Sequence, residues 1–123
     1  MKFVLDDSGG GLPIRHYTEG RVTIGQEVYQ GSLILLPDRV IPDWSPSAFE
    51  ELQAADLGLL AELAPEIVIL GTGKQQLFPH PSLLQPLMQA RIGFEAMTTP
   101  AACRTYNILM SEGRRVAAAL FMI

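Results

Sequence analysis

The sequence predicts a mixed α/β (α+β) fold, in which N-terminal antiparallel hairpin strands precede a C-terminal β-α-β-α-β parallel unit. Three observations support this. The chain has 123 residues, 48% of them hydrophobic, which is enough for the core of one compact domain spanning residues 1–123. Residues 21–36 carry strand-like apolar runs around a glycine turn. From residue 66 onward, short apolar runs alternate with helical patterns.

The N-terminal third should contain two or three antiparallel strands. Residues 1–16 are rich in glycine and lack periodicity, which indicates a flexible arm; the alternative is a loosely attached edge segment. Val22, Ile24 and Val28 around a Gly25-Gln26 turn predict a hairpin. Residues 33–36 form an apolar strand that Pro37 should end.

Residues 46–64 predict one helix or two short helical pieces, because Phe49, Leu52 and three later leucines recur at helical spacing. Ser47 and Glu50, three residues apart, fit a capping box. Gly58 weakens a continuous helix by about 1 kcal/mol relative to alanine, and Pro65 should end the pattern.

The second half should form right-handed parallel crossovers. Residues 66–70 and 92–97 read as buried strands, and residues 82–91 between them as a helix with Pro86 in its first turn. A helix over residues 99–112 should follow, capped by Thr99, with Pro100 at its first position and Gly113 closing it. Residues 115–122 complete the unit as a strand.

Composition argues against several classes of protein. The net charge is −4, whereas nucleic-acid binders concentrate positive charge. The longest apolar run is far shorter than the roughly 20 residues that a membrane-spanning helix needs. Asp6 and Asp7 interrupt the place of a signal peptide's apolar run, and one cysteine forms no internal disulfide. We therefore expect a soluble, cytoplasmic protein with no cofactor.

A candidate ligand site lies where two predicted strands end. Gly71, Thr72, Gly73 and Lys74 follow the first strand, and Thr98 and Thr99 follow the second, so these loops should meet at the carboxyl edge of the sheet. Backbone amides near Gly73 and Ala101, with Lys74, would suit a small anion. The turn is not a P-loop, because Val68 and Gln75 occupy two of its required positions. The alternative is a tight turn that only glycine makes.

Arg104 and Asn107 extend this candidate site along the last helix. They lie three residues apart, on a stripe separate from the apolar face of Ala102, Cys103 and Tyr106, and together they would hold a carboxylate or carbonyl. The alternative is that Arg104 is solvated and Asn107 binds the backbone of a neighbouring loop.

The remaining reactive side chains form no catalytic or metal-binding pattern. Cys103 lies in the first turn of a helix, where a thiol can become reactive, but its apolar face favours a small buried hydrophobe. His16 and His80 are far apart and give no metal-ligand spacing. Trp44, in a proline-bracketed loop, should pack on the sheet; the alternative is an exposed anchor for a partner.

Four segments resemble one known family. They are Gly71-Thr72-Gly73 after an Ile-Val-Ile-Leu strand, Thr99-Pro100-Ala101-Ala102, Arg104-Thr105-Tyr106-Asn107 and Glu112-Gly113-Arg114-Arg115-Val116-Ala117. Their order and spacing are similar to those of the uncharacterised Mth938-like family, which includes a mitochondrial assembly factor for respiratory complex I (NADH dehydrogenase). The resemblance runs from about Tyr17 to the C-terminus, and the last segment is the most specific.

The resemblance implies a single three-layer β/β/α domain and, for the mitochondrial members, assembly of NADH dehydrogenase with a partner protein. It implies no established enzyme activity. The leading hypothesis is therefore a non-catalytic module that binds a protein partner, with a homodimer through the exposed hairpin edge as a further option. The competing hypothesis is a small-molecule site, enzymatic or not, between the Gly71–Lys74 loop and the Thr98–Asn107 helix start.

Overall fold

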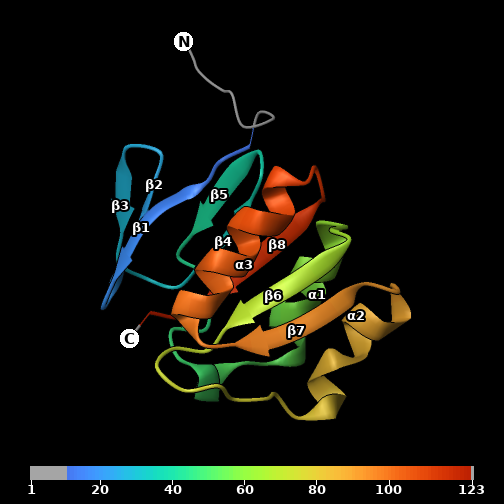
Figure 1. Cartoon of the computed structure of the whole chain (residues 1–123). Helices are drawn as coiled ribbons and strands as arrows, with labels where there is room; N and C mark the ends of the chain where they lie inside the picture. Colours follow the sequence, from blue (N-terminus) through green and yellow to red (C-terminus); the bar gives the residue numbers. More distant parts are fainter. Residues whose placement is uncertain (1–10, 123) are drawn as a thin grey trace.

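A computed structural model describes residues 11–122 as two β-sheets and three α-helices (Figure 1). The first sheet is antiparallel, in the order β1-β2-β3, and the second is mixed, in the order β5-β4-β8-β6-β7. Their strands are β1 (Ile14–Thr18), β2 (Arg21–Ile24), β3 (Glu27–Tyr29), β4 (Leu33–Leu36), β5 (Arg39–Pro42), β6 (Ile67–Gly71), β7 (Gly93–Met97) and β8 (Val116–Leu120). The helices are α1 (Ala54–Glu62), α2 (Gln85–Gln89) and α3 (Thr99–Ser111), with short 3₁₀ turns η1 (Phe49–Glu51) and η2 (Pro81–Leu84).

The five-stranded sheet is buried on both faces, so its central strands read as continuous apolar runs. In β8, Val116, Ala118 and Leu120 face one core, while Ala117 and Ala119 face the other. The first core lies under α3 and the three-stranded sheet; the second lies under α1, η1 and α2. Figure 1 shows α3 in front of the sheet, with β1, β2 and β3 beside it. The mixed α/β fold with three layers is thus confirmed.

The predicted second-half unit is also confirmed. Strands β6 and β7 are parallel, and so are β6 and β8, with α2 and α3 in the two connections. The helix predicted at residues 82–91 divides into η2 and α2, and Pro86 lies in the first turn of α2 rather than of a longer helix. Residues 46–64 likewise form two pieces, η1 and α1, of which α1 passes through Gly58 without a break.

Two cap assignments were wrong. Ser47 does not bond Glu50; its amide and hydroxyl both donate to the carboxylate of Glu51, at 3.0 and 2.9 Å. These bonds lower the pKa of Glu51. In α3 the N-cap residue is Thr98, whose hydroxyl accepts from the amide of Ala101 at 3.4 Å. Thr99 is the first helical residue and is fully buried, so its hydroxyl serves another purpose.

The flexible arm predicted for residues 1–16 is wrong over residues 14–16, where the alternative, an edge segment, holds. Residues 14–16 are the start of β1, an edge strand, whereas residues 1–10 lie outside the part of the chain that the structure describes. Strand β5 was also not predicted: after Pro37 the chain turns at once and runs back along β4, pairing Leu36 with Arg39.

Trp44 is 4% exposed and packs on Phe121 with 5.2 Å between ring centroids. The packing interpretation of Trp44 is therefore confirmed and the exposed-anchor alternative is wrong.

Candidate functional site

The glycine turn after β6 is held by its own side chains. The buried hydroxyl of Thr72 lies 2.5 Å from the carbonyl of Gln75 and 3.1 Å from that of Met97, and it accepts from the amide of Leu77. Gly73 has φ +96°, a conformation that glycine adopts without steric cost. The turn therefore uses both its glycine and its threonine to fold the loop.

The start of α3 meets this turn, as the sequence predicts, but the two close upon each other. The hydroxyl of Thr99 accepts from the amide of Gly73 at 2.8 Å and donates to the carbonyl of Phe121 at 2.6 Å. The amide of Thr99 in turn donates to the carbonyl of Gly73 at 2.9 Å. One buried hydroxyl thus joins the ends of β6 and β8 to the first turn of α3.

The donors expected to bind a small anion here have partners inside the protein. The amide of Gly73 bonds Thr99, and that of Ala101 bonds Thr98. Lys74 is exposed and pairs with Glu19, at 3.5 Å between Nζ and Oε2. These contacts support the structural reading of the Gly71–Lys74 turn, and an anion site at this point stays a prediction.

Asn107 and Arg104 face β1 rather than the glycine turn. The side chain of Asn107 accepts from the amide of Ile14 and donates to its carbonyl, both at 2.8 Å. The hydroxyl of Tyr106 donates to the carbonyl of Leu12, also at 2.8 Å. Helix α3 therefore clamps the chain that enters β1, which is the backbone-binding role considered as the alternative for Asn107.

Arg104 is exposed and lies beside a pocket between β1 and the first half of α3. The pocket has a volume of about 340 Å³ and is lined by eight residues: Ile14, Arg15, His16, Tyr17, Pro100, Cys103, Arg104 and Asn107. Two guanidinium groups and an imidazole are among them, and no carboxylate is. The structure thus groups Arg104 and Asn107 with Arg15, His16 and Tyr17. From the sequence, Arg15 and His16 are predicted to lie in the arm, and Tyr17 has no predicted role in a site.

The thiol of Cys103 borders this pocket and is a weak nucleophile. Burial raises its pKa from the ordinary value of 9.0 to about 12, although the positive charge of Arg104 opposes the shift. The side chain is 4% exposed. Because only the thiolate is a strong nucleophile, the interpretation of Cys103 as a small buried hydrophobe is favoured over a reactive cysteine.

An apolar hollow lies at the opposite edge of the five-stranded sheet, beside β7. It has a volume of about 390 Å³ and is lined by Gln76, Phe78, Pro79, Leu84, Phe94, Glu95 and Ala96. The Phe78 side chain is 70% exposed. The side chain of Gln76 donates to the carbonyl of Ala96 at 2.9 Å, so part of the strand edge is covered by the preceding loop.

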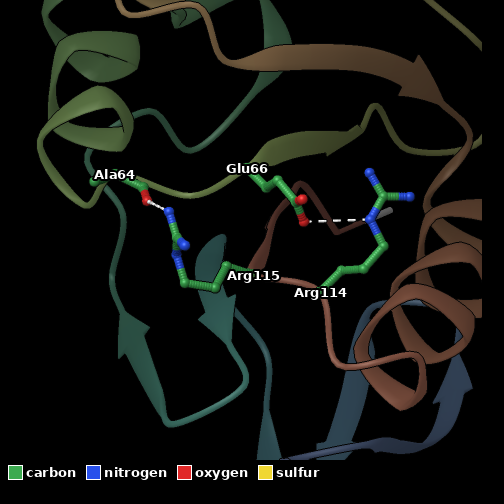
Figure 2. A network of polar contacts seen from close by, with 4 residues as sticks. All are labelled: Ala64, Glu66, Arg114 and Arg115. Atoms are coloured by element: carbon green, nitrogen blue, oxygen red, sulfur yellow. Dashed lines mark hydrogen bonds and ion pairs between the residues drawn. The ribbon is translucent and has the colours of Figure 1, made fainter.

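A polar cluster occupies the amino ends of β6 and β8 (Figure 2). Nε of Arg114 donates to the carboxylate of Glu66 at 3.2 Å, and Arg115 points the other way, donating to the carbonyl of Ala64 at 2.9 Å. The backbone of Glu66 bonds Arg115 and Gly93 on the flanking strands. These arginines join strand ends and a loop, which gives a structural account of the Glu112–Ala117 segment.

His80 has a local structural role. Its Nδ1 accepts from the amide of Ser82 at 3.1 Å and lies 2.9 Å from the Ser82 hydroxyl, so the ring caps η2. His16 lies in β1, on the far sheet.

Within residues 11–122, none of the helices is long and apolar enough to cross a membrane.

Comparison with known protein families gives one match that covers most of the chain. Residues 14–121 match the family described as "Protein of unknown function (DUF498/DUF598)". The chain is 36% identical, over 105 residues, to the mouse protein "NADH dehydrogenase [ubiquinone] 1 alpha subcomplex assembly factor 3". That alignment covers 84% of this chain and 56% of the mouse protein, so the chain spans little more than half of that relative.

Bacterial relatives are matched over more of their length. The "13 kDa major membrane protein" of Francisella tularensis is 29% identical over 104 residues, which cover 84% of this chain and 85% of that protein. A crystal structure of a Bordetella parapertussis protein superposes with a TM-score of 0.86 at 35% identity, over 93% of this chain and 98% of that one. A solution structure from Bordetella pertussis, described as a Mth938-like domain, gives a TM-score of 0.83 at 30% identity, over 99% of this chain and 92% of that one.

Proposed function

The chain belongs to the DUF498/DUF598 family of proteins of unknown function, which has the Mth938-like fold, and we propose that it is a non-catalytic module that binds a partner protein. Two kinds of support lead there. Several relatives are named as assembly factors of NADH dehydrogenase, and assembly factors act by binding other proteins. The arrangement of polar side chains in residues 11–122 also favours structural roles over catalysis.

One observation carries the proposal: Phe78 is 70% exposed beside a hollow that is mainly apolar. A phenylalanine side chain left in water forgoes the free energy of about 1.5–3 kcal/mol that its burial would contribute, and aromatic side chains are enriched at protein interfaces. The hollow beside it includes Leu84 and Phe94, which would receive an apolar side chain from a partner. We propose that Phe78 and this hollow, here called the β7-edge surface, dock the partner.

The partner's chemistry follows from that surface. An extended segment with one large apolar side chain would fill the hollow, and its backbone would lie along the part of the β7 edge that Gln76 leaves uncovered. By analogy with the relatives named as assembly factors, we propose that the partner is a protein of respiratory complex I assembly. A cytoplasmic location is likewise a proposal, supported by a lone cysteine that is buried and unbridged.

The test is capture of the partner from cells by the tagged chain and by two variants. Phe78→Ser should lose most of the captured partner, because it removes the exposed ring without touching the core. Leu59→Ser, at a large apolar residue that is 39% exposed on α1, is the matched control and should retain the partner. The proposal fails if the wild-type chain recovers no stoichiometric partner, or if Phe78→Ser recovers as much as wild type. Mass of the complex in solution separates a partner protein from a second copy of this chain.

A further inference from the structure

The pocket between β1 and α3 concentrates positive charge in an acidic protein. The chain carries a net charge of −4, yet Arg15, Arg104 and His16 line one pocket together, with no carboxylate in its lining. The ion pairs found within residues 11–122 involve Lys74 and Arg114, not these arginines. Two guanidinium groups at one hollow repel each other unless a negative group lies between them.

The backbone of β1 is shaped to bring these side chains together. Strand β1 pairs Ile14 with Ile24 but His16 with Thr23, so Arg15 is an extra residue in a β-bulge. In a regular strand, successive side chains point to opposite faces. A bulge redirects side chains, and bulges recur next to functional sites. Here four consecutive residues, 14–17, line the same pocket.

The pocket is also held in shape before any ligand arrives. Asn107 makes two hydrogen bonds to the backbone of Ile14, directly beside the bulge, and Tyr106 fixes Leu12. The pocket wall on α3 belongs to the first half of a helix whose start is capped by Thr98. A preformed site binds its ligand without the cost of ordering the chain.

One pocket residue has an unused hydrogen-bond donor. The hydroxyl oxygen of Tyr17 is buried and lacks a hydrogen-bond partner among residues 11–122. Such groups are uncommon and call for an explanation, of which an absent ligand is one. Burial raises the pKa of Tyr17, and electrostatic coupling to Cys103 and Glu19 raises it further, so its hydroxyl keeps its proton. A protonated phenol donates to an anion.

We propose that this pocket, here called the β1–α3 pocket, binds a small oxyanion, a carboxylate or a phosphate, between the guanidinium groups of Arg15 and Arg104. Guanidinium forks bind both kinds of anion through paired hydrogen bonds. A volume of about 340 Å³ is large enough for a small organic molecule and not only for an inorganic ion. The anionic group would meet the arginines, with Tyr17 and His16 as further polar contacts. This assignment does not rest on the proposed docking function.

The experiment titrates the ¹⁵N-labelled chain separately with inorganic phosphate and with succinate, at an ionic strength held constant with chloride. We expect saturable shifts of the amide signals at residues 14–17 and 103–107, with a dissociation constant of about 1 mM or lower for at least one of the two probes. Arg15→Gln and Arg104→Gln should each weaken binding about tenfold or more. Both arginines are exposed, so the fold should survive.

Arg91→Gln is the matched control, since Arg91 is an exposed arginine directly after α2. Figure 1 shows α2 across the molecule from β1. It should leave binding unchanged. Saturation by phosphate alone identifies a phosphate site, and saturation by succinate alone identifies a carboxylate site. Shifts that do not saturate with either probe, or that persist equally in Arg15→Gln and Arg104→Gln, overturn the proposal. Phe78→Ser should bind the probe as wild type does, so failure here is distinguishable from failure of the docking proposal.

Discussion

Thr99 is the residue on which the junction between two strands and a helix most depends. Its hydroxyl satisfies both the amide of Gly73 and the carbonyl of Phe121, and all three groups are buried. We predict that Thr99→Val lowers the free energy of unfolding by about 2–4 kcal/mol, because valine leaves a buried donor and a buried acceptor without partners. Urea denaturation measures the change.

Two neighbouring substitutions are its controls. Thr99→Ser keeps the hydroxyl and should cost less than Thr99→Val. Thr98→Ala removes a long cap bond of 3.4 Å at a half-buried position and should cost about 1 kcal/mol. If Thr98→Ala proves as destabilising as Thr99→Val, then the cap, and not the buried hydroxyl, secures the start of α3.

The buried thiol of Cys103 makes stability fall at alkaline pH. Its pKa is 9.0 when exposed and about 12 in the folded protein, so above pH 9 the unfolded chain binds fewer protons than the folded chain. The contribution of the protonated Cys103 thiol to the free energy of unfolding is complete below pH 9 and is lost as the pH rises through about 12. Buried Tyr106, whose pKa is also raised, acts in the same direction. We predict that Cys103→Ala loses less stability than wild type between pH 8 and about pH 10.5.

The difference at about pH 10.5 should be on the order of 2 kcal/mol, from the cost of about 1.4 kcal/mol per pH unit. Urea denaturation of both proteins at each pH measures it, and Cys103→Ala controls for the tyrosines because it keeps them. Equal losses in the two proteins would show that the thiol ionises as easily in the folded chain as in the unfolded one.

At the scale of elements, the predictable parts were those that carry their own signal. The apolar run of β6, the glycine turn of the β2–β3 hairpin and the proline-to-glycine limits of α3 each specify an element locally. Strands β1 and β5 carry no such local signal. Each is a short edge strand with an exposed arginine, and each forms because a neighbouring strand pairs with it. Likewise Pro86 fits the first turn of a helix starting at either residue 82 or residue 85, so the split into η2 and α2 could not be read from its position.

Two glycines in different elements should respond to alanine with opposite signs. At Gly58, in α1, an added Cβ would meet no atom within 4 Å, so Gly58→Ala should stabilise by about 0.5–1 kcal/mol through helix propensity. At Gly71, ending β6, the Cβ would lie 2.9 Å from Leu120 and 3.1 Å from the Thr99 hydroxyl. Gly71→Ala should destabilise by about 1–3 kcal/mol through overpacking. Thermal unfolding of both variants tests the pair, and a Gly71→Ala protein as stable as wild type would contradict the tight packing.

At the scale of the whole molecule, the location of the candidate pocket depended on contacts between distant parts of the chain. Sequence reasoning placed Arg104 and Asn107 near Gly73, since parallel strands end at one edge of a sheet. The helix start does meet that edge, but Asn107 lies more than two turns along α3 and faces β1, 93 residues earlier. The pattern Ile14-Arg15-His16-Tyr17 had a weak signal of its own, because an apolar residue and an aromatic one flank an arginine and a histidine, but the glycines before it obscured that signal.

The two proposed surfaces lie on different elements, the β7-edge surface beside β7 and the β1–α3 pocket on the other sheet, so they should act independently. Substitutions at distant sites without shared partners usually add. We predict that the double variant Phe78→Ser with Arg104→Gln shows the partner loss of the first change and the weakened anion binding of the second, each within about 0.5 kcal/mol of the single variant. Calorimetry with the captured partner, with and without the anion, measures both. A change in partner affinity on adding the anion to the wild-type chain would show instead that the two surfaces are coupled, because such coupling acts in both directions.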